Sequence, residues 1–298
     1  MEELNYESNL VEDDRIKLIY DDNEKKGNST FPIYNQEIWN MYKNSESVQW
    51  TVQEVDYSKD KKGYEELNPN EKFFVKKILA FFSNVDGIVA RICDVQLSDI
   101  FKNIKELETL YRFQARMEDV HNETYSTLID TMIIDTQEKL NVLNGSMIYS
   151  DIKEKVEWIT INVDPKKRSL PYLILAQAIV EGVLFSGAFC AIYWFKKKNV
   201  MPGLTLSNEF IARDEGLHTE TGVMVYNLLK NKLNQEEAHR LMTEAVNLEK
   251  KFITESIPCN LIGMNDKLMC QYIEFIADRL LVQVNYEKIY NSSNPFDF

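Results

Sequence analysis

Two copies of one pattern constrain this chain most: a lone acidic residue in an apolar segment, followed further along by Glu-x-x-His. The copies are Asp86 with Glu118-x-x-His121, and Glu181 with Glu215-x-x-His218. Residues three apart lie on one face of a helix, so each Glu-x-x-His presents a carboxylate and an imidazole together. Each upstream acid lies among apolar residues, where an unpaired carboxylate is costly. The pattern therefore predicts helices that gather acids and histidines inward.

The pieces add up to a metal site in a four-helix bundle. Two Glu-x-x-His helices and one carboxylate from each of two others supply four carboxylates and two imidazoles, the ligand set of di-iron and di-manganese bundles. These ligands suit iron or manganese and exclude a zinc site built on cysteines, and both metals stay open. A ligating histidine needs an outer partner for its second ring nitrogen, and Asp214, beside Glu215, is a candidate.

Single pieces of the pattern also have ordinary explanations. A third copy, Glu236-x-x-His239, lies among polar residues with no apolar-segment acid to match it, so we interpret it as a solvated helix face. Asp86 alone could pair with a nearby cation such as Arg91. The matching of each good copy with its upstream acid, rather than the motif itself, is therefore the informative signal.

The segment around Glu181 is apolar enough to raise the question of a membrane. Residues 173–195 are long enough to span a bilayer, and Lys196-Lys197-Lys198 follows them. Gln177 and Glu181 inside the segment, and the absence of a second such segment, argue against this reading. We interpret the segment as the central helix of a bundle and expect no membrane partner.

Composition narrows the class further. The 298 residues carry a net charge of −13, which argues against a nucleic-acid-binding surface. With 44% apolar residues, ten Gly and seven Pro, the chain has material for a large core and for long helices. The four cysteines form no C-x-x-C pair and the N-terminus has no signal-peptide pattern, so we expect reduced thiols and a cytoplasmic protein.

Apolar periodicity predicts an all-α protein without strands. Residues 1–30 are expected to form a mobile acidic arm, and residues 31–298 one domain. Short helices are expected within 31–65, and a break at 144–146. Longer helices are expected over 69–100, 103–136, 151–163, 170–196, 207–231, 234–256 and 266–290.

One tyrosine has a notable position. Tyr125 lies one helical turn past His121, on the same face. An ordinary core tyrosine is the simpler explanation, but a tyrosine beside an oxygen-activating metal pair could be oxidised to a radical. A radical needs a dry, inert pocket, and Phe185, Phe189 and Ile211 could form it.

Longer motifs resemble one family. The segments that carry the resemblance are Trp50–Asp60, Phe113–Ser126, Val180–Gly187, Met201–His218, Ile273–Arg279 and Asn294–Phe298. Together they closely resemble the small subunit of class I ribonucleotide reductase, of the eukaryotic and large-virus type. The resemblance covers nearly everything from residue 31 onward.

The resemblance implies a fold, a cofactor and residue roles. It implies a homodimer of ferritin-like four-helix bundles with additional packed helices, in which two Fe ions per chain and O2 generate a tyrosyl radical. It places the metal ligands at Asp86, Glu118, His121, Glu181, Glu215 and His218. It places the radical at Tyr125, its route outward at Trp50 and Asp214 with His121, and its apolar lining at Phe185, Phe189 and Ile211.

The same resemblance implies an oxidoreductase activity. A separate large catalytic subunit would receive the radical and reduce ribonucleoside diphosphates to deoxyribonucleotides for DNA synthesis. Two other hypotheses stay open: a ferroxidase or iron-storage bundle, which would form a cage, and an inactive paralogue with a structural role.

The chain departs from the family pattern in places. Ala90–Cys93 stands where the family usually has Asn-Glu-Asn, and residues 98–105 and 137–171 also diverge. Family members continue past Asn-Pro-Phe-Asp-Phe with a tail that docks on the large subunit. This sequence stops at Phe298, so it is expected to be truncated, to assemble metal and radical, and to bind its partner poorly.

Overall fold

The computed structural model describes residues 29–256 and 264–296. All but the last two residues of the arm predicted over residues 1–30 lie outside the described residues, and so does Cys259. Within the described ranges every regular element is a helix and none is a strand, so the all-α prediction is confirmed. The three cysteines described, Cys93, Cys190 and Cys270, are free thiols, as expected.

The helices follow one another with short connections. The first part of the chain forms α2 (Gln36–Ser47), the 3-10 turn η2 (Val52–Glu54), α3 (Asp60–Glu66), α4 (Pro69–Arg91), the π-helical segment η3 (Ile92–Leu97), α5 (Ser98–Ile100) and α6 (Lys105–Met132). Next come α7 (Thr136–Leu143), α8 (Gly145–Ile148), α9 (Ser150–Asn162), α10 (Leu170–Ile179), the π-helical η4 (Val180–Leu184) and α11 (Ser186–Lys198). The last are α12 (Pro202–Leu228), α13 (Gln235–Lys251), the π-helical η5 (Phe252–Ser256) and α14 (Asp266–Gln283).

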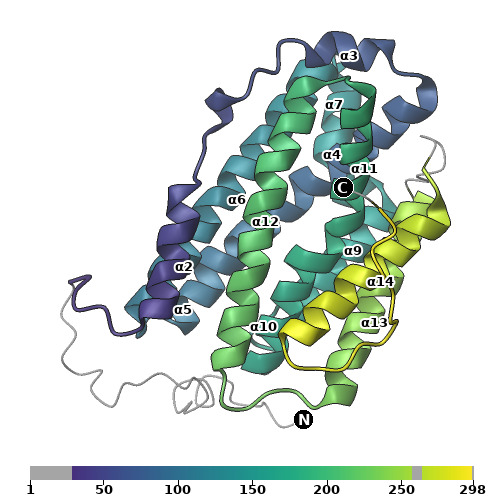
Figure 1. The fold of residues 1–298 in the computed structure, drawn as a ribbon. Helices are drawn as coiled ribbons and strands as arrows, with labels where there is room; N and C mark the ends of the chain where they lie inside the picture. Colours follow the sequence, from purple (N-terminus) through teal and green to yellow (C-terminus); the bar gives the residue numbers. More distant parts are fainter. Residues whose placement is uncertain (1–28, 257–263, 297–298) are drawn as a thin grey trace.

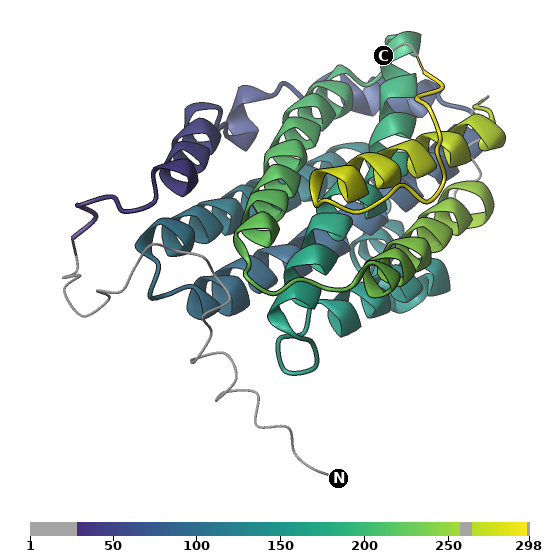
Figure 2. The ribbon, with the colours of Figure 1, turned by 60° about the horizontal axis from the view of Figure 1, so that its bottom comes forward.

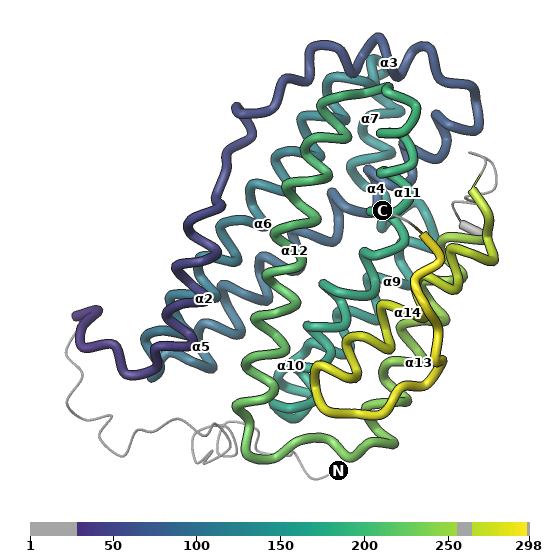
Figure 3. The backbone as a smooth tube through the Cα atoms, viewed as in Figure 1, coloured from purple at the N-terminus to yellow at the C-terminus, as the bar shows by residue number. Residues whose placement is uncertain are grey.

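Four long helical elements make the central bundle. They are α4, α6, α12 and the continuous run of α10, η4 and α11 (Figure 1). Helix α2 packs on α6 and α12, while α13 and α14 cover the α10–α11 run on the other side (Figure 2). The smooth backbone trace shows the last described segment turning back along α14 (Figure 3).

Local sequence signals set where the bundle helices begin. Asn68 caps α4: its side chain accepts from the Glu71 amide at 3.0 Å, and the Glu71 side chain accepts from the Asn68 amide at 3.0 Å. Helix α12 is capped from a distance. Buried Asp60 accepts from the amides of Gly203 at 2.8 Å and Leu204 at 2.7 Å, which orients the helix that carries Asp214, Glu215 and His218. The start of α12 therefore depends on a residue far away in the sequence.

The apolar run at 170–198 is the core of the bundle. It is long and apolar enough to cross a membrane, yet 94% of its most apolar 18-residue stretch is buried inside the protein. Close helix approach explains part of this burial, because a Cβ on Gly222 of α12 would lie 2.9 Å from the Cβ of Ala178. The continuous helix predicted over 170–196 is wrong in one respect: η4 interrupts it with a π-helical turn.

The predicted helix over 266–290 is also wrong at its end, since α14 stops at Gln283. The buried carboxylate of Asp278 accepts hydrogen bonds from the amides of Ile289 at 2.9 Å, Tyr290 at 3.0 Å and Ser292 at 3.1 Å. These bonds hold the following segment back against α14 instead of letting the helix continue.

The helix predicted over 103–136 also ends earlier than expected, and a local hydrogen bond again accompanies the difference. Helix α6 ends at Met132, and Asp135 caps a new helix, α7, by accepting from the Glu138 amide at 2.7 Å. The break expected at 144–146 is limited to Asn144, because α8 starts at Gly145.

Candidate metal centre

The six residues singled out as ligands meet in the middle of the bundle, and all are buried. Asp86 comes from α4, Glu118 and His121 from α6, Glu181 from η4, and Glu215 and His218 from α12. Their ligand atoms form two groups, each within 4.8 Å: Asp86, Glu118 and His121 in one, and Glu118, Glu181, Glu215 and His218 in the other. Glu118 belongs to both groups, so it could serve as a ligand in either.

Several ligand atoms have no hydrogen-bond partner among the described residues. They are both carboxylate oxygens of Asp86 and of Glu118, Oε2 of Glu181, and Nδ1 of His121. Leaving buried polar atoms unsatisfied is expensive, and here they converge on one small volume. The pairing of Asp86 with Arg91 is wrong, because Arg91 is exposed and bonds neither oxygen. The orphaned donor set fits a pair of cations.

The imidazoles face the carboxylates through Nδ1. His121 Nδ1 lies 3.1 Å from Glu215 Oε1 and 3.4 Å from Glu118 Oε2. His218 Nδ1 lies 2.8 Å from Glu118 Oε1 and 3.2 Å from Glu215 Oε2. The Nδ1 atoms and the carboxylate oxygens therefore point at the same space, and in their deprotonated forms they have the arrangement of a coordination sphere.

The electrostatics of the cluster favour bound cations. Burial, reinforced by Glu118, raises the pKa of Asp86, and burial with the charge of Glu215 raises the pKa of Glu181. Burial alone would lower the pKa of His218, but Glu118 and Glu215 outweigh it and raise this pKa to about 10. Conversely the two histidines outweigh burial at Glu215 and lower its pKa. The raised pKa values show that the clustered carboxylates repel one another and favour bound protons. Bound cations would reduce the same repulsion.

A chain of side chains leads from the cluster toward the surface. Asp214 Oδ2 lies 3.1 Å from His121 Nε2 and accepts from the Trp50 ring N–H at 2.7 Å. The Trp50 and His121 rings stack with centroids 6.2 Å apart. Arg213, which the sequence did not single out, donates to Asp214 Oδ1 at 3.3 Å and to the Val48 carbonyl at 2.6 Å, and so ties Asp214 to the segment just before Trp50.

Tyr125 lies in an apolar pocket beside the ligands. Its hydroxyl has no partner among the described residues, and burial together with the charge of Asp86 raises its pKa well above the ordinary value. Phe82, which the sequence analysis missed, stacks on it with centroids 4.7 Å apart and planes at 4°. The ring of Phe82 in turn packs against those of Phe189 and Phe185, with ring centroids 4.9 Å and 5.6 Å apart. Ile211, the third predicted lining residue, is fully buried.

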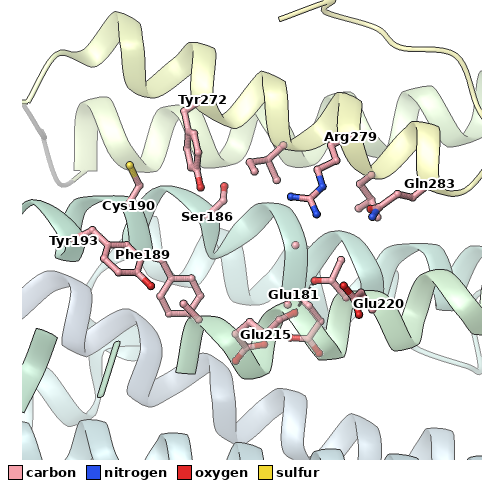
Figure 4. Close-up of a pocket in the computed structure, with 16 residues that line it drawn as sticks. Glu181, Ser186, Phe189, Cys190, Tyr193, Glu215, Glu220, Tyr272, Arg279 and Gln283 are labelled. Carbon is pink, nitrogen blue, oxygen red and sulfur yellow. Dashed lines mark hydrogen bonds between the residues drawn. The ribbon is translucent and has the colours of Figure 1, made fainter. Parts of the chain in front are cut away.

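Two further features surround the carboxylates. Gln114, four residues before Glu118 on α6, donates to Glu181 Oε1 at 2.9 Å. A cavity of about 220 Å³ lies between α11, α12 and α14 and reaches Glu181 and Glu215. Figure 4 shows these two carboxylates side by side, with Arg279 and Gln283 extending from α14 on the opposite wall. Of the six candidate ligands, Glu181 and Glu215 therefore border this cavity.

The third Glu-x-x-His copy plays no part in the cluster. His239 belongs to neither ligand group, and its Nε2 lies 2.9 Å from the backbone carbonyl of Glu287 at the surface.

Comparison with known proteins places this site in a family. The profile of the family described as ribonucleotide reductase, small chain, matches residues 27–295. The chain belongs to the ribonucleotide reductase small-chain family. It is 46% identical over 269 residues to the ribonucleoside-diphosphate reductase small chain of Plasmodium falciparum, covering 90% of this chain and 76% of that one. It is also 46% identical over 269 residues to the small chain of Yaba-like disease virus, covering 90% and 82%.

A solved structure agrees with the sequence relatives. The Rnr4 homodimer of Saccharomyces cerevisiae aligns with a TM-score of 0.84 at 29% identity, covering 99% of this chain and 93% of that one. The resemblance predicted from sequence is confirmed, as are the ferritin-like helical fold and the assignment to ribonucleoside-diphosphate reductase, an oxidoreductase, as its small subunit. The buried carboxylates and imidazoles could hold metal, in line with a family of di-iron and di-manganese small subunits.

Proposed function

We propose that this chain holds two iron ions on its six inward ligands and uses them with O2 to generate a radical on Tyr125. The observation that carries the proposal is the convergence of four carboxylates and two imidazoles, several of them without other partners, beside a buried tyrosine. When bound, the ferrous pair supplies electrons to O2 and the oxidising power that removes an electron from the tyrosine. Manganese fits the same ligands and is the alternative metal.

The ligands divide the work between two ions. Asp86 and His121 would hold one ion, while Glu181, Glu215 and His218 would hold the other. Glu118 would contribute to both, since it belongs to both groups. Four carboxylates and two neutral imidazoles carry four negative charges, which two divalent ions neutralise. A buried site with no net charge avoids the cost of isolated charge in a low-dielectric interior.

The surroundings of Tyr125 suit a long-lived radical. Its hydroxyl meets no hydrogen-bond donor among the described side chains, and stacked Phe82 covers one face of the ring. Apolar packing around a buried ring of this kind limits the access of water to it. The raised pKa keeps the phenol protonated until it is oxidised.

The hydrogen-bonded series His121, Asp214 and Trp50 supports a route by which the radical leaves the site. Asp214 uses one oxygen for both partners, so a proton and an electron can shift along short contacts. We propose that the receiver is the large catalytic subunit, which reduces ribonucleoside diphosphates, and that this chain acts in the cytoplasm as a homodimer. An iron-storage bundle has no use for this series.

Reconstitution tests the proposal. Adding Fe(II) and O2 to the metal-free protein is expected to give a tyrosyl radical signal in electron paramagnetic resonance. Tyr125→Phe should abolish the signal while two irons stay bound. Tyr111→Phe is the matched control, because Tyr111 lies on the same helix, is fully buried, and also has an unpartnered hydroxyl. Two bound irons without a radical in the unmutated protein, or a radical that survives Tyr125→Phe, would overturn the proposal.

A further inference from the structure

The π-helical segment η4, which carries Glu181, ends in a helix break at Phe185, between η4 and α11. Side chains from other helices bond the backbone on both sides of this break. π-Helical turns are rare and disturb the regular backbone hydrogen bonds around them. Two backbone groups, one at the last residue of η4 and one in the first turn of α11, bond side chains of other helices. The Leu184 carbonyl accepts from Lys155 Nζ at 2.7 Å, and the Gly187 amide donates to Glu249 Oε1 at 3.0 Å.

The two supporting side chains form a fully buried ion pair. Lys155 Nζ and Glu249 Oε2 are 2.6 Å apart, and both side chains have 0% exposure. The ammonium also sits 3.8 Å from the ring centroid of Phe81 and 4.1 Å from that of Phe252. A buried ion pair by itself contributes little net stability compared with apolar residues of the same volume. Its presence here therefore calls for a role beyond stability.

The fit around Gly187 is tight. A Cβ at this position would lie 2.6 Å from Glu249 Oε1 and 2.5 Å from Ile253 Cγ1. Glycine thus lets α13 and η5 approach the break closely enough for the carboxylate to reach the amide. The hydrogen bonds around the break therefore join three helices: Lys155 lies on α9, Glu249 on α13 and Gly187 on α11.

The break lies between two parts of the proposed reaction site. On its near side is Glu181, with Oε2 free for a metal. At the break itself is Phe185, whose ring centroid is 5.6 Å from that of Phe82, the ring that stacks on Tyr125. A shift of the break would move a metal ligand and the radical pocket together.

We propose that Lys155 and Glu249 are positioning residues that hold this break in the geometry that aims Glu181 at the metal pair and Phe185 at the radical pocket. The inference rests on the proposed metal role of Glu181. The pair acts through the backbone it bonds and touches no reacting atom.

The test is the double variant Lys155→Met/Glu249→Leu, which removes both charges at once and so leaves no uncompensated charge in the core. Lys77→Met/Asp151→Leu is the matched control. It removes another largely buried ion pair, 2.7 Å long, that joins α9 to α4, with Asp151 one turn before Lys155 on α9. The readouts are Fe(II) affinity without oxygen, hydrogen exchange at the Gly187 amide, and radical lifetime.

We expect the Lys155/Glu249 double variant to bind the second Fe(II) about tenfold to a hundredfold more weakly, in the range seen when groups that orient ligands are removed. Gly187 exchange should accelerate and the radical should decay faster. The control should leave all three readouts unchanged. A second variant, Lys155→Met/Glu249→Gln, keeps an acceptor for the Gly187 amide and should recover part of the affinity.

Unchanged Fe(II) affinity and unchanged Gly187 exchange in a folded double variant would overturn the inference. Equal losses in the Leu and Gln versions would also overturn it, because the acceptor for Gly187 would then be irrelevant. Failure of the proposed function has a different signature, since the unmutated protein itself would then not bind two ions.

Discussion

Loading the metal site should release about four protons per chain. The pKa values of Asp86, Glu181, His121 and His218 are all raised, that of His218 to about 10, so the buried cluster without metal favours the protonated forms of these four groups. Ligands bind metal in their deprotonated forms, so the protons must leave as the ions enter. The exchange conserves charge, because four protons and two divalent ions carry the same total.

The sign and size of the pH dependence follow from this exchange. Two protons leave for each ion, so the affinity for each ion should rise with pH, by about a hundredfold per unit while the groups remain protonated. In the metal-free protein the same groups have raised pKa values. Their contribution to stability is full below their unfolded pKa values and is lost as pH rises through the folded ones.

The assay is an anaerobic Fe(II) titration in weak buffer with a pH indicator, repeated by calorimetry in buffers of different ionisation enthalpy. His239→Ala is the control variant, since the third Glu-x-x-His copy contributes no ligand and should leave the count unchanged. Release of one proton or fewer per chain, or an affinity that does not change with pH, would refute the reasoning.

Three further outcomes are expected. Phe82→Ala should lower the free energy of unfolding by about 3–5 kcal/mol and shorten the lifetime of the Tyr125 radical while two irons still bind, as seen by denaturation and paramagnetic resonance. Burial raises the pKa of Asp60 to about 6, so its contribution to stability is full below the ordinary value of 3.8 and is lost as pH rises through about 6. Urea unfolding of Asp60→Asn at several pH values should lack that loss, and an identical pH profile in both proteins would contradict it. Asp278→Ala removes the acceptor for three backbone amides, should cost about 2–4 kcal/mol, and should speed hydrogen exchange over residues 289–292; unchanged exchange would show that the segment is held by other contacts.

Helix periodicity and buried acids predicted most of the bundle, because both reflect burial along one chain segment. The π-helical turn at η4 could not be predicted in this way. It depends on Lys155 and Glu249, which lie far from it in sequence and meet it only in the folded protein. The end of α14 was missed for a different reason, because Asp278 bonds amides 11 to 14 residues further on, and such a local hydrogen bond leaves no periodic signal in the sequence.

The candidate site divides along the same line. Its ligands could be predicted because each carries a charge that an apolar helix does not tolerate without a partner. Phe82 and Arg213 could not, because an aromatic or a cation in a helix has many ordinary uses. The one available signal for Phe82 was its position four residues before Asp86, which places both on one helical face.

The most direct test of the central claim is a crystal structure of the iron-loaded protein with anomalous diffraction at the iron edge. The account expects two adjacent peaks in each chain. One should be bounded by Asp86, Glu118 and His121, and the other by Glu118, Glu181, Glu215 and His218. A single peak, or peaks outside these ligands, would contradict it.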